Sequence, residues 1–247
     1  MNKTKRILAL TGRNIKEVLR DPMSLAFAFG LPEVMLIVFY FAFHTMTSQF
    51  EMKYLCPSLI VFAQAFLTLF IGLLMSTDKD GAYINRLYVS GAGAGEFVLG
   101  YAFATYPLAV MQSALIFVTG VIIEPAFASA YIFIGVAFSV LTATLFISFG
   151  LLFGSLFGVK SVGGAASIVI TGQSILSGMW FPLDALSSGF ITFLKCLPFK
   201  NVTDLLVGAV NDFTFADGVF VPLIVTLAYS AVVFVLAVLA FKRQMQK

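Results

Sequence analysis

The sequence predicts an all-α integral membrane protein with six membrane-spanning helices, and three observations support this prediction. Hydrophobic residues make up 60% of the 247 residues and charged residues only 11%, whereas soluble domains are about 25% charged. The mean hydropathy is +1.00. The apolar residues also fall in long runs, and each span needs about 20 residues. The length therefore accommodates six spans with short connections and leaves no room for a soluble catalytic domain.

An amphipathic helix is expected before the first span, over residues 4–20. Its apolar residues share one helical face, opposite most of its charged residues, a pattern typical of a helix lying on the membrane surface. A basic flank that only orients the first span is the alternative, but it leaves the apolar face unexplained. Pro22 is expected to end this helix, because proline disfavours helical geometry in the residue before it. The apolar face consists of Ile7, Leu8, Ile15, Val18 and Leu19.

Six apolar runs follow, at residues 23–45, 55–75, 96–123, 127–157, 162–180 and 219–241. The third and fourth are longer than a bilayer requires, so their ends are expected to tilt or project. Of the 15 lysines and arginines, only Lys53, Lys195 and Lys200 fall on the side opposite the N-terminus, which leaves 12 on the N-terminal side. The positive-inside rule therefore places both termini in the cytoplasm of a multi-pass protein of the cell membrane.

Two connections are long enough to have structure of their own. In the cytoplasmic connection, residues 76–95, we expect Thr77 to cap a short helix with Asp78 and Asp80 in its first turn, followed by a glycine-rich break. The extracytoplasmic connection, residues 181–218, is rich in leucine and phenylalanine. It is expected to form short re-entrant helices, whose backbone polar groups need partners in the protein or in a wet cavity. Residues 1–247 then form a single transmembrane domain.

This order of parts resembles the membrane subunit of the type-2 ATP-binding-cassette (ABC) exporter family over nearly the whole chain. The sequence departs from the family pattern at Gly91, where a proline is usual, and at Glu33, where the family is generally apolar. Four features carry the resemblance: the surface helix running through residues 20–22 into a first span interrupted by Pro32; the cytoplasmic residues 80–81 and 86–90; the stretch 177–183 with residues 197–199 and 204–206; and the outer segment before the final helix.

The resemblance implies a permease that moves an amphiphilic substrate, such as a drug, lipid or peptide, outward through the lipid bilayer. It implies a dimer with a second permease copy or a related permease, on a dimer of ABC ATPase subunits, with the first and fifth spans lining a shared cavity. No cofactor is expected on this chain, because ATP and Mg²⁺ would be bound by the partner ATPase. Coupling to the ATPase is expected to involve Thr77, Asp78, Lys79, Asp80, Arg86, Leu87 and Tyr88.

The sequence contains no phosphate-binding loop of the form G-x-x-x-x-G-K-[ST]. The nearest stretch, residues 154–161, has the wrong spacing. Gly150, Gly154 and Gly158 recur instead at every fourth position, which favours close helix packing, within the subunit rather than at the dimer seam. ATP hydrolysis is therefore expected in a separate subunit.

Several polar residues within the apolar runs are candidates for a substrate path. Glu33 is the only acid deep in such a run; it could bind a cationic group or a proton, or lie near the headgroups if the entry helix is shallow. The other polar residues could line the path, but such residues also join helices by hydrogen bonds. They are Gln64, Thr171, Gln173, Ser174 and Ser177.

Other functional classes are less well supported by the sequence. A proton-coupled secondary transporter using Glu33 predicts internal repeats, and none is evident. An intramembrane enzyme needs a nucleophile and base or metal ligands, and His44 is the only histidine. No metal site and no nucleic-acid partner are expected. Cys56 and Cys196 are both predicted outside, where they could form a disulfide in an oxidising space.

Overall fold

The computed structural model describes residues 3–81, 93–180, 187–211 and 218–244, and their regular structure is entirely helical. Six helical segments are long and apolar enough to cross a membrane, which confirms the predicted number of spans. These spans are Pro22–Phe43, Met52–Asp80, Ala94–Ile123, Tyr131–Leu156, Val159–Leu176 and Phe220–Gln244. The helices are α1 (Lys3–Leu19), α2 (Pro22–Leu25), α3 (Leu31–Phe43), α4 (Met52–Asp80), α6 (Ala94–Ile123), α7 (Tyr131–Leu156), α8 (Val159–Leu176), α9 (Ser188–Cys196), α10 (Pro198–Asn211) and α11 (Phe220–Gln244).

The first span is an interrupted helix made of α2, a π-helical turn (Ala26–Gly30) and α3. Asp21 caps its start, because the carboxylate accepts hydrogen bonds from the backbone N–H groups of Met23 and Ser24. Pro32 lies in the first turn of α3 and has no N–H to donate to the preceding turn. The interruption therefore coincides with the position where the regular hydrogen-bond ladder loses a donor.

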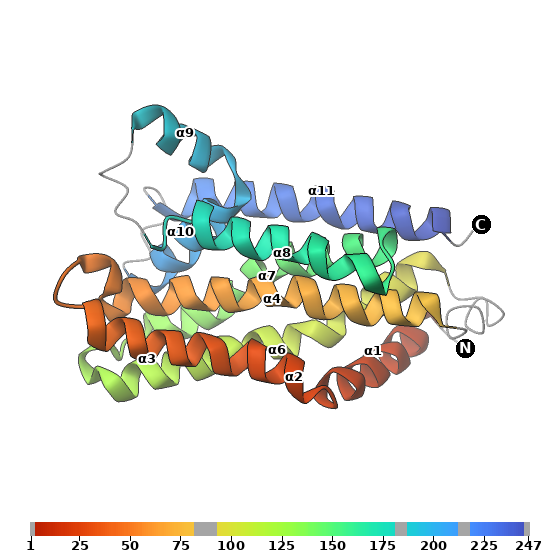
Figure 1. Ribbon diagram of the computed structural model, residues 1–247, viewed down its shortest axis with the longest axis horizontal. Coiled ribbons are helices and arrows are strands. Elements are labelled where there is room, and N and C mark those ends of the chain that lie inside the picture. The colour runs from red at the N-terminus through yellow and green to blue at the C-terminus, as the bar shows by residue number, and fades with distance from the viewer. Residues whose placement is uncertain (1–2, 82–92, 181–186, 212–217, 245–247) are drawn as a thin grey trace.

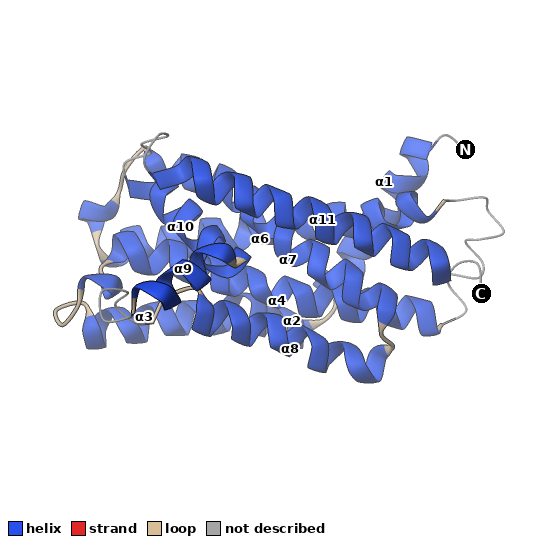
Figure 2. Ribbon diagram, turned by 90° about the horizontal axis from the view of Figure 1, so that it is seen from above, coloured by secondary structure: helices blue, strands red, loops and turns tan. Residues whose placement is uncertain are grey.

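The spans run side by side, with α1 across one end of the bundle, near the C-terminal end of α11 (Figure 1, Figure 2). Helix α4 is central: 78% of its most apolar window is buried within the chain, against 17–44% in the other spans. It packs against α3, α6, α7, α8 and α10. Four of the other spans thus pack around α4, whereas α11 packs on α6, α7 and α10, and these spans keep much of their own surface for lipid or for other subunits.

Close packing between α4 and α7 depends on glycines of both helices. A Cβ at Gly154 would lie 2.8 Å from the Cβ of Met75, and one at Gly72 would lie 3.2 Å from the carbonyl oxygen of Gly150. A side chain at Gly154 would require the helices to shift, and one at Gly72 would make a tight contact with the Gly150 backbone. The Gly150 and Gly154 surface therefore packs on α4 of the same chain.

Two helices, α9 and α10, lie between the fifth and sixth spans at the end of the bundle opposite α1 (Figure 1). Helix α10 packs against α4, α7 and α11, and most of its residues are buried. Helix α9 projects from the bundle and exposes Phe190 and Phe193. Short re-entrant helices were expected here. Two short helices are present, and α10 packs mainly against three of the spans.

The helix expected to begin at Thr77 does not begin there. Helix α4 continues without interruption to Asp80, so Thr77, Asp78, Lys79 and Asp80 form its last turn. All three charged residues of this turn have partners on neighbouring helices, which stabilises the helical conformation to Asp80. Arg86, Leu87 and Tyr88 lie outside the described residues, as do Gly91 and Ala92 of the glycine-rich stretch. The rest of that stretch is no break, because Gly93 caps α6 and Ala94 and Gly95 form the start of this helix.

Candidate functional site

A buried carboxylate joins three helices at the end of the bundle where α1 and the C-terminal end of α11 lie. This end is called inner, after the side predicted to be cytoplasmic, and the opposite end is called outer. Asp78 of α4 is only 6% exposed. Both guanidinium nitrogens of Arg13 on α1 donate to it, one at 2.7 Å. The hydroxyl of Tyr101 on α6 donates to the same carboxylate at 2.6 Å. Bidentate, charge-assisted bonds of this kind are among the strongest in proteins and hold their partners in one orientation.

The next two residues of α4 bind the turn between α7 and α8. Lys79 Nζ donates to the carbonyl oxygens of Gly154, Ser155 and Phe157, at 3.1, 3.3 and 2.6 Å. Asp80 accepts a hydrogen bond from the N–H of Val159, the first residue of α8, at 3.2 Å. A cation at a helix C-terminus and an anion at a helix N-terminus both bond backbone groups that have no partner within the helix, and each is attracted to the opposite partial charge of the helix dipole.

The last turn of α4 is therefore bonded to α1, α6, α7 and α8 together. Of the residues predicted for ATPase coupling, Asp78, Lys79 and Asp80 make these bonds, whereas Thr77 is exposed. Arg13 and Tyr101 were not predicted. No local pattern could have identified them, because Arg13 lies 65 residues before Asp78 in the chain.

Most residues predicted for the substrate path bond inside the chain. Gln64 is fully buried; it donates to the carbonyl of Ser139 at 2.9 Å and accepts from Thr142 at 2.7 Å. Gln173, also fully buried, donates to Thr203 of α10 at 2.9 Å. In the described part of the chain these side chains join helices rather than line an open path.

Ser174, Ser177 and Thr171 lie along the outer part of α8 and just beyond it, and they differ in role. Ser174 accepts a hydrogen bond from the indole N–H of Trp180 at 2.8 Å. Ser177 accepts from the N–H of Met179 at 3.3 Å. Thr171 is exposed. Only Thr171 among these three presents its side chain outward from the bundle.

Glu33 lies in the first turn of α3 and is half-buried. Its buried Oε1 has no hydrogen-bond partner among the residues that the structure describes. One oxygen of this carboxylate is thus available to a proton, a water or a bound cationic group.

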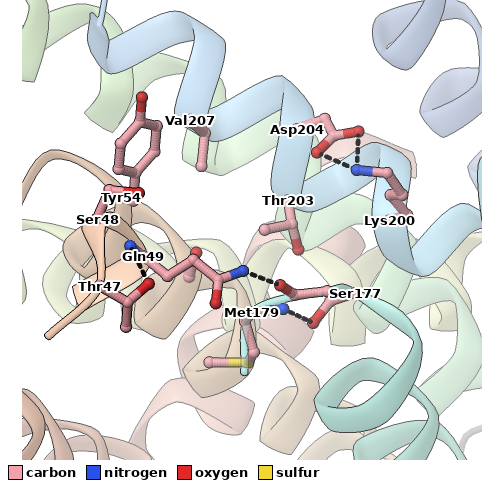
Figure 3. A pocket seen from close by; sticks show the side chains of 12 residues that line it. Thr47, Ser48, Gln49, Tyr54, Ser177, Met179, Lys200, Thr203, Asp204 and Val207 are labelled. Atoms are coloured by element: carbon pink, nitrogen blue, oxygen red, sulfur yellow. Dashed lines mark hydrogen bonds and ion pairs between the residues drawn. The ribbon is translucent and has the colours of Figure 1, made fainter. Parts of the chain in front are cut away.

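A polar cavity of about 300 Å³ lies at the outer end, between α10, the start of α4 and the turn after α8 (Figure 3). Its charged wall is an ion pair in which Lys200 Nζ lies 2.8 and 2.7 Å from the two oxygens of Asp204. Burial raises the pKa of Asp204 above its ordinary 3.8, and Lys200 partly offsets this effect. Lys200 itself is only 4% exposed.

The backbone after α8 shapes the other wall of this cavity. Gly178 has a φ of 77°, a left-handed conformation common just past a helix C-terminus and favoured by glycine. This turn exposes the Gly178 carbonyl, which accepts a hydrogen bond from Gln49 at 3.2 Å. Ser177 and Met179 also line the cavity (Figure 3). Of these residues only Ser177 was predicted, although the Gly178 turn and the Lys200–Asp204 spacing were visible signals.

Helix α8 presents an outward face on which polar side chains lie beside the exposed Ile168 and Ile175. Ser167 and Thr171 are exposed, together with Gly164. The helix is the least hydrophobic of the six spans, with a mean hydropathy of 1.2, and only 22% of its residues are buried within the chain. Hydroxyl groups gain little from contact with lipid tails and usually face protein or water at membrane depth. This face is therefore suited to a second subunit or an aqueous cavity.

The remaining candidates for chemistry are dispersed. Among the described residues, no group of three or more His, Cys, Asp and Glu residues could hold a metal ion. His44 stacks on Tyr40 at 4.5 Å and bonds the Tyr40 carbonyl. The disulfide that the sequence left open is not formed: Cys56 is buried on α4 and Cys196 is exposed at the end of α9, and both are free.

Comparison with known families matches residues 5–211 to the family described as ABC-2 type transporter. The matched region extends from α1 to the end of α10 and contains both the inner junction and the outer cavity. A search among curated proteins found no match to this chain.

Proposed function

This chain belongs to the ABC-2 type transporter family, and we propose that it moves an amphiphilic substrate, such as a drug, lipid or peptide, outward across the cell membrane. It is a permease component of an ABC transporter, and we propose that ATP and Mg²⁺ bind to a separate dimer of ATPase subunits. The observation that carries the proposal is the junction at the last turn of α4. Gly81 follows this turn directly and leads into residues 82–92, the segment proposed to contact the ATPase.

A force applied to that segment would displace the last turn of α4, which is bonded to four other helices. ATP binding would draw the ATPase subunits together, and the loop containing Arg86, Leu87 and Tyr88 would transmit the movement to α4. Packed helices switch between discrete arrangements rather than deforming continuously. The helices of the permease would therefore move as rigid units, and the permease would alternate between two packings of these helices.

We propose that the outward face of α8 lines the translocation cavity together with a second permease copy or a related permease. Its exposed Thr171 and Ser167 supply polar groups, and the outer cavity beside Ser177 lies at the same helix's far end. An amphiphile needs both polar and apolar contacts, and this helix also exposes Ile168 and Ile175. Both termini would lie in the cytoplasm, on the side of the inner junction.

The test compares variants of the permease assembled with its ATPase. Asp80→Ala and Arg86→Ala should each lower the ATPase activity that depends on the permease and the ATP-driven uptake of a fluorescent amphiphilic dye into inside-out vesicles. Lys160→Ala is the matched control, because Lys160 is an exposed cation at the same end of the bundle. All three variants should insert at the native level. Unchanged coupling in Asp80→Ala and Arg86→Ala would remove the assignment of this segment.

A second candidate function rests on the free oxygen of Glu33. A proton-coupled transporter would use this carboxylate to carry a proton across the membrane. It predicts uptake driven by a pH gradient without any ATPase subunit, and loss of that uptake in Glu33→Gln. The exporter predicts that the purified permease alone moves no dye under the same gradient.

A further inference from the structure

We infer that the last turn of α4 is a two-sided junction: Asp78 transmits movement to α1 and α6, and Lys79 with Asp80 transmits it to the α7–α8 turn. This inference rests on the proposed function and specifies how that function would work. Its first support is the set of bonds that the turn makes. Consecutive residues of an α-helix point about 100° apart, which allows Asp78 to bond α1 and α6 while Lys79 and Asp80 bond the α7–α8 turn.

The first side of the junction binds a preassembled unit of α1 and α6. Arg6 of α1 lies 3.5 Å from Glu96 of α6. Leu10 packs directly on Gly100, where a Cβ would approach the Leu10 side chain to within 2.7 Å. Helix α1 thus lies closely along the start of α6 and moves with it.

Arg13 and Tyr101 connect this unit to α4. Helix α1 packs mainly along α6, and the Arg13 guanidinium reaches across to Asp78. Tyr101 is 1% exposed, and it binds the same carboxylate from α6. Since both α1 and α6 bond one carboxylate, a displacement of Asp78 moves them together.

The second side of the junction holds the α7–α8 turn through backbone atoms only. Lys79 binds three carbonyl oxygens at the end of α7, and Asp80 binds the first N–H of α8. Ser76, one turn earlier on α4, adds a bond to the Phe157 carbonyl at 3.0 Å. Contacts to backbone atoms fix the helix ends themselves, so a shift of Lys79 and Asp80 would reorient the start of α8.

The two sides predict separable effects of two substitutions. Asp78→Asn removes the charge that Arg13 and Tyr101 bind, and it leaves Lys79 and Asp80 intact. Lys79→Met removes the cation at the end of α7 and leaves Asp78 intact. Each variant is therefore the matched control for the other.

The experiment measures distances by pulsed electron paramagnetic resonance in the assembled permease–ATPase complex. One spin label replaces Lys5 on α1 or Lys160 on α8, and a second replaces Gln244 at the end of α11; all three positions are exposed. Cys196 is exposed and is changed to serine beforehand. A non-hydrolysable ATP analogue should shift both distances in the native background.

In Asp78→Asn the nucleotide-dependent shift at Lys5 should fall by at least half, while the shift at Lys160 persists. In Lys79→Met the pattern should reverse. Tyr101→Phe removes a single hydroxyl, so it serves if Asp78→Asn fails to insert, and it should weaken only the response at Lys5. A merely structural role for these residues would lower both responses equally, and that result would overturn the inference.

The ATPase activity of the complex, compared with that of the ATPase alone, reports separately on the proposed function. If the permease changes that activity but neither distance responds to nucleotide, the proposed function stands and the two-sided junction is wrong. If the permease does not change that activity and nucleotide shifts neither distance, both are wrong. If both distances respond equally in every variant, only the junction is wrong.

Discussion

Alanine at Gly150 should destabilise the bundle, although alanine is the better helix former. A Cβ at this position would lie 2.8 Å from the carbonyl oxygen of Thr68 and 3.1 Å from its Cα, and it would overlap the Ile71 side chain. The Thr68 atoms belong to the backbone of α4 and cannot rotate away. Helices α4 and α7 must therefore separate to accommodate one methyl group.

A matched substitution isolates the steric cost. Gly164 lies in α8, and a Cβ there would meet no atom of this chain within 4 Å. Changing glycine to alanine reduces the entropy of the unfolded chain by about the same amount at both positions, roughly 0.5–1 kcal/mol. This gain cancels when the two variants are compared. What remains is the cost of overpacking, typically about 1–3 kcal/mol.

The assay is the free energy of unfolding of the detergent-solubilised chain, titrated with a denaturing detergent. Gly150→Ala should be less stable than Gly164→Ala by about 1–3 kcal/mol. Gly164→Ala should match or slightly exceed the native protein. Equal stability of the two variants would refute the close approach of α4 and α7 at Gly150.

Three further predictions concern polar groups. Gln64→Leu should lower the free energy of unfolding by about 1 kcal/mol, because hydrogen bonds between membrane helices average roughly 0.6 kcal/mol and Gln64 makes two of them. Dye transport per inserted molecule should stay unchanged, and a loss of transport without a loss of stability would show that Gln64 lines the substrate path. The pKa of Asp204 is raised above 3.8, so the stability that the protonated carboxyl contributes is complete below pH 3.8 and is lost as the pH rises through the raised pKa. The thermal midpoint of the native chain should therefore exceed that of Asp204→Asn by an amount that grows as the pH is lowered from 6.5 to 3.5. A difference that stays constant over this range would contradict the raised pKa. Hydrogen bonds from Ser24 hold the pKa of Asp21 below its ordinary value. Near neutral pH, Asp21→Ala should therefore lower the free energy of unfolding by about 1 kcal/mol, and this difference should vanish as the pH falls through the lowered pKa. A loss of stability that persists in acid would contradict the capping role.

The number and type of the elements could be predicted because a bilayer constrains a sequence in one dimension. A run of about 20 apolar residues has few alternatives to a spanning helix. The observed spans begin and end within a few residues of the predicted ones, except where charged residues continue a helix. Helix α4 extends to Asp80, beyond the apolar run that ends at residue 75, because Asp78 and Lys79 are bonded inside the protein.

The role of individual polar residues could not be predicted in the same way. Gln64 and Thr171 both interrupt apolar runs, yet one is fully buried and the other is exposed. The difference depends on which face of each helix meets a neighbour, and that is set by residues 75–78 positions away, such as Ser139 and Thr142. Composition locates a polar residue along a span but does not specify its partner.

Helix α8 links the two sites that the structure brings into view. Its first residue is bonded to Asp80 at the inner junction. At the outer end Gln173 binds Thr203 of α10, and the following turn at Gly178 binds Gln49 beside the outer cavity. A stiff helix held at both ends must tilt or shift as a unit when one end is displaced. A movement that enters at Asp80 would therefore reach the outer cavity along α8. The same helix presents the face that we propose as the substrate path, so α8 would both transmit the movement and line the path.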